Sequence, residues 1–155
     1  MTVAAVQIVR IAETPPVGFE TLREEAAAEG YGFIDRLAGE LAGGIYAGDA
    51  DLPVMLAAFR EGGLVAIGGL TPDPYDSAPD LARIRHVYVR PAMRREGVGR
   101  WLTSALIQQG LAVAARLSLR AADARSAAFW EAQGFSRDEG GTARTHLLTR
   151  QGWPS

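Results

Sequence analysis

A glycine-containing turn near the middle of the chain restricts most strongly what this sequence can fold into. The segment from Arg94 to Gly99 reads Arg-Arg-Glu-Gly-Val-Gly, and it separates an extended run at 84–89 from an amphipathic helical pattern. Glycine accepts left-handed backbone and lets other groups approach the main chain, and the first N–H groups of a helix lack partners within the helix. A strand-to-helix turn of this kind is expected to hold an anion such as a phosphate.

Two familiar nucleotide-binding patterns do not match this turn. A P-loop requires a Lys and then a Ser or Thr after its second glycine, and this pair does not follow Gly99. The third glycine of the dinucleotide fingerprint is replaced by Thr103 or its neighbours. The turn therefore indicates another phosphate-bearing ligand.

The turn and the strand end before it resemble the coenzyme A loop of the GNAT superfamily of acyl-CoA-dependent N-acetyltransferases. The family pattern is R/Q-x-x-G-x-G/A after a V-x-V strand end and a Pro, which is Val87-Tyr88-Val89-Arg90-Pro91 in this chain. Residues 123–135 (Asp-Ala-Arg-Ser-Ala-Ala-Phe-Trp-Glu-Ala-Gln-Gly-Phe) are similar to the second family signature, N-x-x-A-x-x-F-Y-x-x-x-G-F. The two motifs occur in the family's order. The resemblance covers residues 50–150, and residues 1–50 fit only in the order of their elements.

The resemblance implies both a fold and an activity. The fold is α/β of the α+β type, a mixed and mostly antiparallel central sheet with helices on both faces, in a single N-acetyltransferase domain over residues 1–155. The activity is transfer of an acetyl group from acetyl-CoA to a primary amine, most simply of a small molecule, by direct attack in a ternary complex. Two alternatives stay open: a non-catalytic CoA-binding or regulatory domain, and a protein or peptide N-acetyltransferase.

Hydrophobic periodicity and glycine or proline breaks give the element order independently of the resemblance. Strands are predicted at 6–11, 53–59, 64–70, 84–89 and 117–119, and helices at 19–30, 33–43, 98–110 and 126–133. A closing hairpin is expected around Arg137 and 143–150, turning at Gly140-Gly141. The Pro- and Asp-rich segment 71–80 is predicted to be an exposed acidic loop.

The resemblance places the chemistry at the end of the strand at 84–89. The backbone N–H of Val87 is implied as the donor to the oxyanion of the tetrahedral intermediate, and Val89 is expected to pair with the pantetheine arm. The residues expected around the coenzyme are Val87, Tyr88, Val89, Arg94, Arg95, Glu96, Gly97, Val98, Gly99, Arg100, Asp123, Ser126 and Trp130. Backbone groups of the turn are expected to bind the pyrophosphate, with the arginine side chains adding contacts or forming a solvated rim.

The second motif departs from the family pattern at Trp130, where the family commonly has a Tyr that protonates the coenzyme sulfur. An indole N–H cannot act as that acid, so Trp130 is interpreted as a packing residue. A thiol with a pKa near ~8.5 leaves tolerably well as a thiolate, and the Ser126 hydroxyl or water could pair with the sulfur.

The general base is not evident from the sequence. The family's base positions are held by Arg83 and Arg85, and arginine cannot serve as a base. These two cations could bind an anionic group of the substrate, or, as we expect, pair with aspartates of the 71–80 loop. His86 titrates in a suitable range and is a candidate catalytic residue, but strict alternation directs it to the opposite face from Val87 unless a bulge intervenes.

Composition excludes several functional classes. The chain has 155 residues, 48% of them hydrophobic, which is enough for a core without disulfides, and it contains no Cys to form a disulfide, a thiolate metal site or a nucleophile. All 16 cationic residues are Arg, the net charge is −2 and no basic run occurs, so a nucleic-acid partner is not expected. With no leader pattern and no apolar stretch near ~20 residues, we expect a cytoplasmic protein without membrane contact. No metal is expected, and the resemblance implies a possible homodimer.

Overall fold

The computed structural model describes residues 5–12, 14–138 and 143–153. The elements occur in the predicted order, with two short 3-10 helices added at Pro91–Met93 and Arg150–Gly152. They are β1 (Val6–Ile11), α1 (Phe19–Ala28), α2 (Phe33–Ala42), β2 (Val54–Arg60), β3 (Gly63–Pro72), β4 (Leu81–Val89), α3 (Val98–Val113), β5 (Arg116–Leu119), α4 (Ala124–Glu131), β6 (Ser136–Arg137) and β7 (His146–Thr149). Gly140-Gly141, the predicted turn of the last hairpin, lies outside the described residues.

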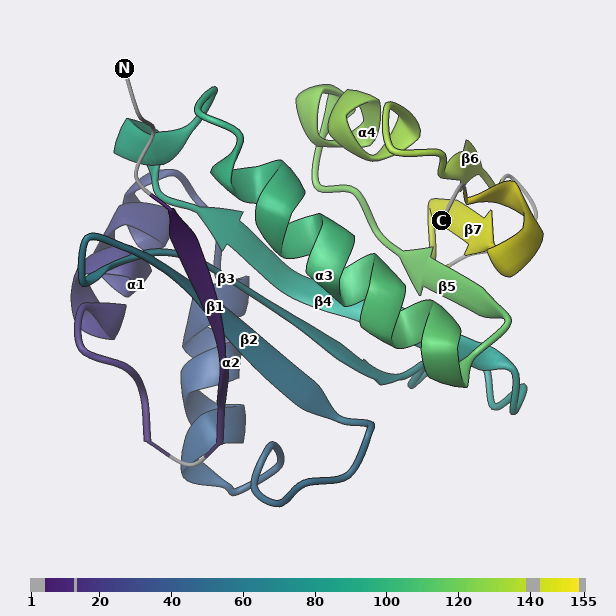
Figure 1. Cartoon of the computed structure of the whole chain (residues 1–155), viewed down its shortest axis with the longest axis horizontal. Coiled ribbons are helices and arrows are strands. Elements are labelled where there is room, and N and C mark those ends of the chain that lie inside the picture. The colour runs from purple at the N-terminus through teal and green to yellow at the C-terminus, as the bar shows by residue number, and fades with distance from the viewer. Residues whose placement is uncertain (1–4, 13, 139–142, 154–155) are drawn as a thin grey trace.

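The strands form one sheet in the order β1-β2-β3-β4-β5-β7-β6 (Figure 1). Every neighbouring pair is antiparallel except β4 and β5, which run parallel. These two strands are paired only where Leu81–Arg83 meets Arg116–Ser118. The rest of β4, from Ile84 to Val89, has no partner strand on that side among the described residues, so the sheet is open between the ends of β4 and β5.

Helices cover both faces of the sheet, as predicted (Figure 1). The amphipathic faces of α1 and α2 pack with Met55, Ile67 and Tyr88 in one core. The other core contains the apolar stripe of α3, with Leu102 and Leu106 fully buried at i, i+4 spacing, against the opposite sheet face. Burial of these stripes holds the sheet between two layers and fixes the position of the opening between β4 and β5.

One predicted helix boundary is wrong, and one aspartate of a predicted exposed loop is buried. Helix α3 continues past Gly110 to Val113, because Gly110 is a close-packing residue and not a stop. A Cβ there would lie 2.7 Å from Leu117 Cδ2, so only glycine lets the helix cross β5 at this distance. The 71–80 segment is mostly exposed, as predicted, but Asp73 is an exception: its side chain is 1% exposed and accepts a hydrogen bond of 2.6 Å from the Ser118 hydroxyl.

A β-bulge interrupts β4 at His86. The register with β3 shifts between Ile67 and Gly69, and His86 has a φ of +60°, in the left-handed region that a side chain rarely adopts. Alternation therefore fails at this point, and the consecutive residues Arg85 and His86 both reach the same carboxylate, that of Glu40 on α2. His86 still faces away from Val87, as alternation predicted, but it joins the wall of the sheet opening.

Candidate active site

A cleft of about 1100 Å³ passes through the opening between β4 and β5. Its walls come from the end of β4, the start of α3, the segment between β5 and α4, and the turn between α1 and α2. All the site residues predicted from the sequence line this cleft except Glu96 and Val98. Glu96 pairs with Arg60 at 3.3 Å, and Val98 is buried in the core with 1% exposure, so their side chains face elsewhere.

The N–H groups of Val87 and Val89 face the opening. The N–H of Arg90 donates to the carbonyl of Val65 on β3 at 2.9 Å. Because backbone groups alternate in direction along a strand, the N–H groups of Val89 and Val87 point the opposite way, toward the gap left by β5. This edge of β4 can therefore donate hydrogen bonds to an extended ligand in place of a neighbouring strand.

The N-terminus of α3 lies at one end of the cleft. Gly97 caps the helix with a φ of +83°, and Arg95 before it has a φ of +69°, so the turn adopts a conformation that suits glycine at its tightest point. Gly99 faces the cleft wall: a Cβ there would lie 3.3 Å from Val89 Cγ2 and 3.5 Å from Phe129 Cζ. The open N–H groups of the first turn and this lack of side chains fit the diphosphate end of a coenzyme A molecule.

The side chain of Arg94 is engaged within the protein. Its Nη1 and Nη2 atoms donate to the carboxylate of Glu29 at 2.8 and 2.6 Å, and its Nε donates to the carbonyl of Val89 at 3.1 Å. Glu29 also accepts a hydrogen bond from the Tyr88 hydroxyl. The Arg94 bonds hold the pKa of Glu29 below its usual range. These bonds make Arg94 a link between α1 and β4, and a contact of its side chain with the coenzyme stays a prediction.

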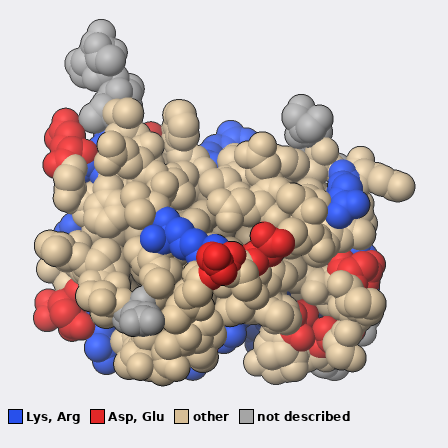
Figure 2. Space-filling view, turned by 60° about the horizontal axis from the view of Figure 1, so that its bottom comes forward, with Lys and Arg blue, Asp and Glu red and all other residues tan. Residues whose placement is uncertain are grey.

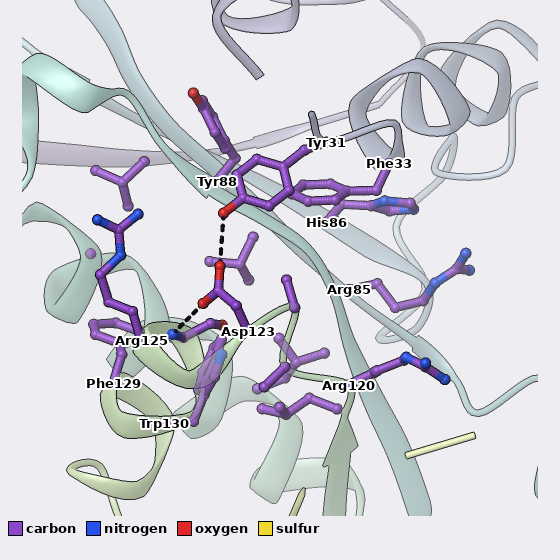
Figure 3. Close-up of a pocket in the computed structure, with 18 of the residues that line it drawn as sticks. Tyr31, Phe33, Arg85, His86, Tyr88, Arg120, Asp123, Arg125, Phe129 and Trp130 are labelled. Atoms are coloured by element: carbon purple, nitrogen blue, oxygen red, sulfur yellow. Dashed lines mark hydrogen bonds between the residues drawn. The ribbon is translucent and has the colours of Figure 1, made fainter. Parts of the chain in front are cut away.

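Asp123 and Ser126 belong to the N-terminus of α4. Asp123 caps this helix, because its Oδ1 accepts the N–H of Ser126 at 2.8 Å. The other carboxylate oxygen, Oδ2, accepts a hydrogen bond of 3.2 Å from the Tyr31 hydroxyl (Figure 3). Tyr31 lies between α1 and α2, so this bond joins opposite walls of the cleft.

Trp130 lies at the base of the cleft and in the core. Its side chain packs edge-on against Phe129 and Phe135, with ring centroids 5.2 and 5.3 Å apart, and the residue is 5% exposed. This placement is the packing position expected from the sequence. Its part in the reaction stays a prediction.

A network around Glu40 was not identified from the sequence. Glu40 Oε1 lies 3.0 Å from His86 Nε2 and 2.6 Å from the Tyr46 hydroxyl, and Oε2 lies 3.3 Å from Arg85 Nη2. A carboxylate only accepts hydrogen bonds, so neutral His86 carries its proton on Nε2. His86 Nδ1 then keeps a free lone pair, and this buried atom has no hydrogen-bond partner among the described residues.

Burial sets the protonation state of this network. The His86 side chain is 3% exposed, and burial lowers its pKa from 6.5, although the negative charge of Glu40 acts in the opposite direction. For Glu40, burial raises the pKa, but the Tyr46 hydrogen bond and the charges of His86 and Arg85 outweigh it and lower the pKa. The network therefore favours a neutral imidazole beside an ionised carboxylate.

The two arginines at the expected base positions are both paired. Arg83 lies 3.6 Å from Asp73 with both side chains buried, which confirms the predicted pairing with the loop aspartates for this residue. Arg85 instead pairs with Glu40, a partner on α2 that the sequence did not indicate. Asp76 and Asp80 pair elsewhere, with Arg144 and Arg116.

Within the described residues, no group of three or more His, Cys, Asp or Glu side chains could hold a metal ion. A search of the same residues for a helix long and apolar enough to cross a bilayer finds none. On the face in Figure 2, arginines lie scattered among acidic side chains and form no extended basic area in the described part of the surface. That arrangement differs from the continuous basic surface of a typical nucleic-acid binder.

Comparisons with known proteins agree with this architecture. Residues 11–135 match the model of the acetyltransferase (GNAT) family. Among solved structures, a candidate acetyltransferase from Exiguobacterium sp. 255-15 is 24% identical with a TM-score of 0.84, over 96% of this chain and 95% of that chain. The ribosomal-protein-S18-alanine N-acetyltransferase of Escherichia coli is 18% identical with a TM-score of 0.62, over 94% of each chain.

N-acetylglutamate synthase of Neisseria gonorrhoeae, in a complex with coenzyme A and N-acetyl-glutamate, is 14% identical with a TM-score of 0.68. That match covers 96% of this chain and 36% of the larger enzyme. At these identities the structural matches establish the fold alone. No protein of curated function matches the sequence significantly.

Proposed function

Because the chain belongs to the GNAT family of acetyltransferases, which use acetyl-CoA, we propose that it acetylates the primary amine of a small molecule by direct attack in a ternary complex. The observation that carries this proposal is the open edge of β4, where the N–H groups of Val87 and Val89 face the cleft beside the N-terminus of α3. Acetyl-CoA supplies the activated thioester. The residues of this chain orient it, stabilise charge and accept the amine proton.

In the proposed mechanism, the Val87 N–H donates to the carbonyl oxygen as that oxygen becomes negative. The amine nitrogen forms a bond to the carbonyl carbon, and the carbon–sulfur bond then breaks to release coenzyme A as a thiolate. A backbone donor suits this task because its position is fixed by strand geometry and needs no side-chain ordering. The Val87 side chain remains packed against the core of the α3 face.

We assign the amine proton to Nδ1 of His86. His86 lines the cleft, its buried Nδ1 has no hydrogen-bond partner among the described residues, and the hydrogen bond from Nε2 to Glu40 fixes the tautomer that leaves Nδ1 basic. A pKa lowered by burial keeps His86 neutral near pH 7, as a base must be. In this proposal Glu40 is a positioning residue, because it acts through His86 and not on the amine.

One contact favours a small acceptor over a protein one. The hydrogen bond between Tyr31 and Asp123 joins the two walls of the cleft, and it restricts the path along which an extended peptide could lie across the site. A compact amine needs only to reach His86 and Val87 within the cleft. A protein acceptor would first have to break this bond.

The direct test is steady-state release of coenzyme A thiol from acetyl-CoA with a panel of amino acids, polyamines, aminoglycosides and peptides with free N-termini. Mass spectrometry of each product should show a gain of one acetyl group on the amine of a small compound. If only peptides are acetylated, the small-molecule proposal is wrong. If calorimetry shows acetyl-CoA binding but no amine is acetylated, the chain is a coenzyme-binding domain and the catalytic proposal is overturned.

A further inference from the structure

The charged residues that line the cleft are almost all cationic. Asp123 is the one acidic residue among those lining it in the described part of the chain, and its two oxygens are already used by Ser126 and Tyr31. The cationic residues in the lining are Arg36, Arg83, Arg85, Arg94, Arg95, Arg100, Arg120 and Arg125. So large an excess of one sign around a cleft raises the local concentration of anionic ligands.

These arginines divide into two sets by position. Arg94, Arg95 and Arg100 lie before and at the start of α3, and Arg125 lies at the start of α4, beside the place that fits a diphosphate. The others come from α2, from the first half of β4 and from the residue after β5. Figure 3 shows Arg85 and Arg120 extending to the same side of the cleft, away from Arg125. The phosphates of a coenzyme on the α3 turn do not account for this second set.

Within the second set, Arg83 is compensated. Its Nη1 lies 3.6 Å from Asp73, and its Nη2 donates to the carbonyl of Ala143 at 2.8 Å. Its guanidinium also lies over the ring of Tyr75, 5.0 Å from the ring centroid. Arg83 is therefore a buried cation paired with Asp73, although its Nη1 has no hydrogen-bond partner among the described residues.

The other three arginines of the set keep binding capacity. Arg85 is 27% exposed and uses one of its nitrogens, Nη2, in a bond of 3.3 Å to Glu40, which leaves Nε and Nη1. Arg36 and Arg120 are exposed, and their side chains have no ion pair or hydrogen bond with other described residues. We call Arg36, Arg85 and Arg120 the acceptor-end arginines.

The acceptor-end arginines line the cleft from three separate segments of the chain. Arg36 is on α2 between Phe33 and Glu40 at helical spacing, and its positive charge contributes to lowering the pKa of His86. Arg85 directly precedes His86. Arg120 is the first residue after β5, two positions beyond Ser118, which pairs with Arg83 of β4 in parallel register. Sheet register and the packing of α2 thus bring the three arginines to the wall of one cleft.

We infer that the acceptor-end arginines bind an oxyanionic group of the acceptor, a carboxylate or a phosphate, so that the substrate is a small amine carrying such a group. Guanidinium groups match both anions in geometry and stay charged at any working pH. The inference rests on the proposed function and names the substrate class for the same site. It also disfavours polyamines and aminoglycosides, whose additional positive charges would be repelled.

The same arginines assist the chemistry. Nearby positive charges disfavour the ammonium form of the bound amine and thus lower its pKa. An acceptor held by its anionic group then presents more of its amine in the neutral, nucleophilic form to Val87 and His86. Binding and activation of the acceptor come from one set of side chains.

The test uses matched pairs of acceptors that differ only in the anion: standard L-amino acids against their α-carboxamides, and O-phosphoethanolamine against ethanolamine. We expect kcat/KM to favour the anionic member of the preferred pair by at least about tenfold, with the difference in KM. The pair that shows the preference tells a carboxylate from a phosphate. In Arg36→Gln and Arg120→Gln the preference should fall about tenfold, with KM for acetyl-CoA unchanged.

The preference is the ratio of kcat/KM for the acid to kcat/KM for the amide. The two compounds differ in amine pKa, but this difference affects the ratio equally in each protein, so it cancels when a variant is compared with the unmodified protein. Arg137→Gln is the matched control, since Arg137 is 61% exposed on β6 and does not line the cleft. Its preference should equal that of the unmodified protein. Equal kcat/KM for anionic and neutral partners, or a loss in Arg120→Gln that is the same for both, would overturn the inference.

A binding measurement separates this inference from the proposed function. With coenzyme A present, calorimetry of the N-acetyl derivatives of the same compounds should show tighter binding of the anionic form, and this should be lost in Arg120→Gln. Anion-dependent binding without turnover would overturn the acetyltransferase proposal and retain the anion site. Turnover of neutral or polycationic amines without any anion preference would retain the activity and reject the site.

Discussion

The two ends of the cleft are built in different ways. At the coenzyme end, the groups that face the ligand are mainly backbone N–H groups, on the edge of β4 and at the first turn of α3. At the acceptor end, side chains from α2, from β4 and from the residue after β5 line the cleft, and the contacts of Arg85 and His86 with Glu40 depend on packing between separate elements. The coenzyme end therefore suits one invariant ligand, while the acceptor end can change with a few side chains. Mutations at the two ends should have different signatures.

Trp130 should give the largest effect, on stability and not on chemistry. Trp130→Ala removes a side chain that is 5% exposed and contacts Phe129 and Phe135, so the free energy of unfolding should fall by about 3–5 kcal/mol. Denaturant titration measures this loss. Trp130→Phe should fold normally and keep kcat within a few-fold, because the coenzyme end uses this residue for packing. A hundredfold lower kcat in a folded Phe variant would show that the indole N–H takes part in the reaction.

At the acceptor end, His86→Gln should lower kcat about a hundredfold, the lower end of what a general base contributes. The affinity for acetyl-CoA should stay the same, since the Val87 and Val89 N–H groups are not altered. Glu40→Gln should give a smaller loss of kcat. Glu40 holds the His86 proton on Nε2 through a 3.0 Å contact, and the amide would hold that tautomer less strongly. If kcat in His86→Gln is unchanged, the amine is deprotonated by water or enters the site already neutral.

The pH dependence of kcat/KM also tests whether His86 is the general base. His86 faces Glu40, Arg85 and Arg36, and burial lowers its pKa below 6.5, so kcat/KM should fall only in acid, below that value. The inflection should not move with the pKa of the acceptor and should vanish in His86→Gln. Between the folded pKa and about 6.5 the unfolded chain binds more protons, so the free energy of unfolding should decrease as pH falls through this window. Glu40, whose pKa is also lowered, should extend the loss below pH 4.5.

The difference between the two ends also explains what the sequence could and could not predict. The Gly97–Gly99 turn and the Val87–Val89 strand end are contiguous, and their function depends on backbone geometry that the local sequence specifies. Glu40 and His86 are far apart in sequence, and their contact requires both the packing of α2 on the sheet and a bulge at one residue of β4. A positive φ at a histidine has no local sequence signal comparable to glycine.

Two other misreadings have the same origin. Gly110 has the local pattern of a helix stop. In the structure its lack of a side chain leaves room for Leu117, seven residues later on β5. Asp73 belongs to a polar, proline-containing segment, but it is buried by Ser118 and Arg83 from two strands. In each case the element order was predictable from periodicity, whereas the environment of one residue depended on tertiary packing.

A change at the coenzyme end should act on affinity and leave the acceptor end intact. Gly99→Val should weaken acetyl-CoA binding at least about tenfold, because the branched side chain would crowd Val89 and Phe129. Gly99→Ala is the matched control: its Cβ, 3.3 Å from Val89 Cγ2, should require only a small adjustment and cost less than about threefold. Calorimetry on both folded variants measures the difference. Unchanged affinity in Gly99→Val would mean that the coenzyme does not bind on this turn.

The smallest effect is expected where the two ends are connected. Tyr31→Phe removes the 3.2 Å hydrogen bond to Asp123 Oδ2 but leaves Asp123 Oδ1 on the Ser126 N–H, so the cap of α4 is kept. An exposed bond of this length contributes little to stability, and the free energy of unfolding should change by less than about 1 kcal/mol.

With the hydrogen bond between Tyr31 and Asp123 removed, release of coenzyme A should become up to about threefold faster, as measured by stopped-flow displacement. Asp123→Ala loses the bond and the cap together and should destabilise the fold more than Tyr31→Phe does. If coenzyme A release is equally fast in Tyr31→Phe and the unmodified protein, this bond does not restrict the cleft, and the argument for a small acceptor loses its structural support.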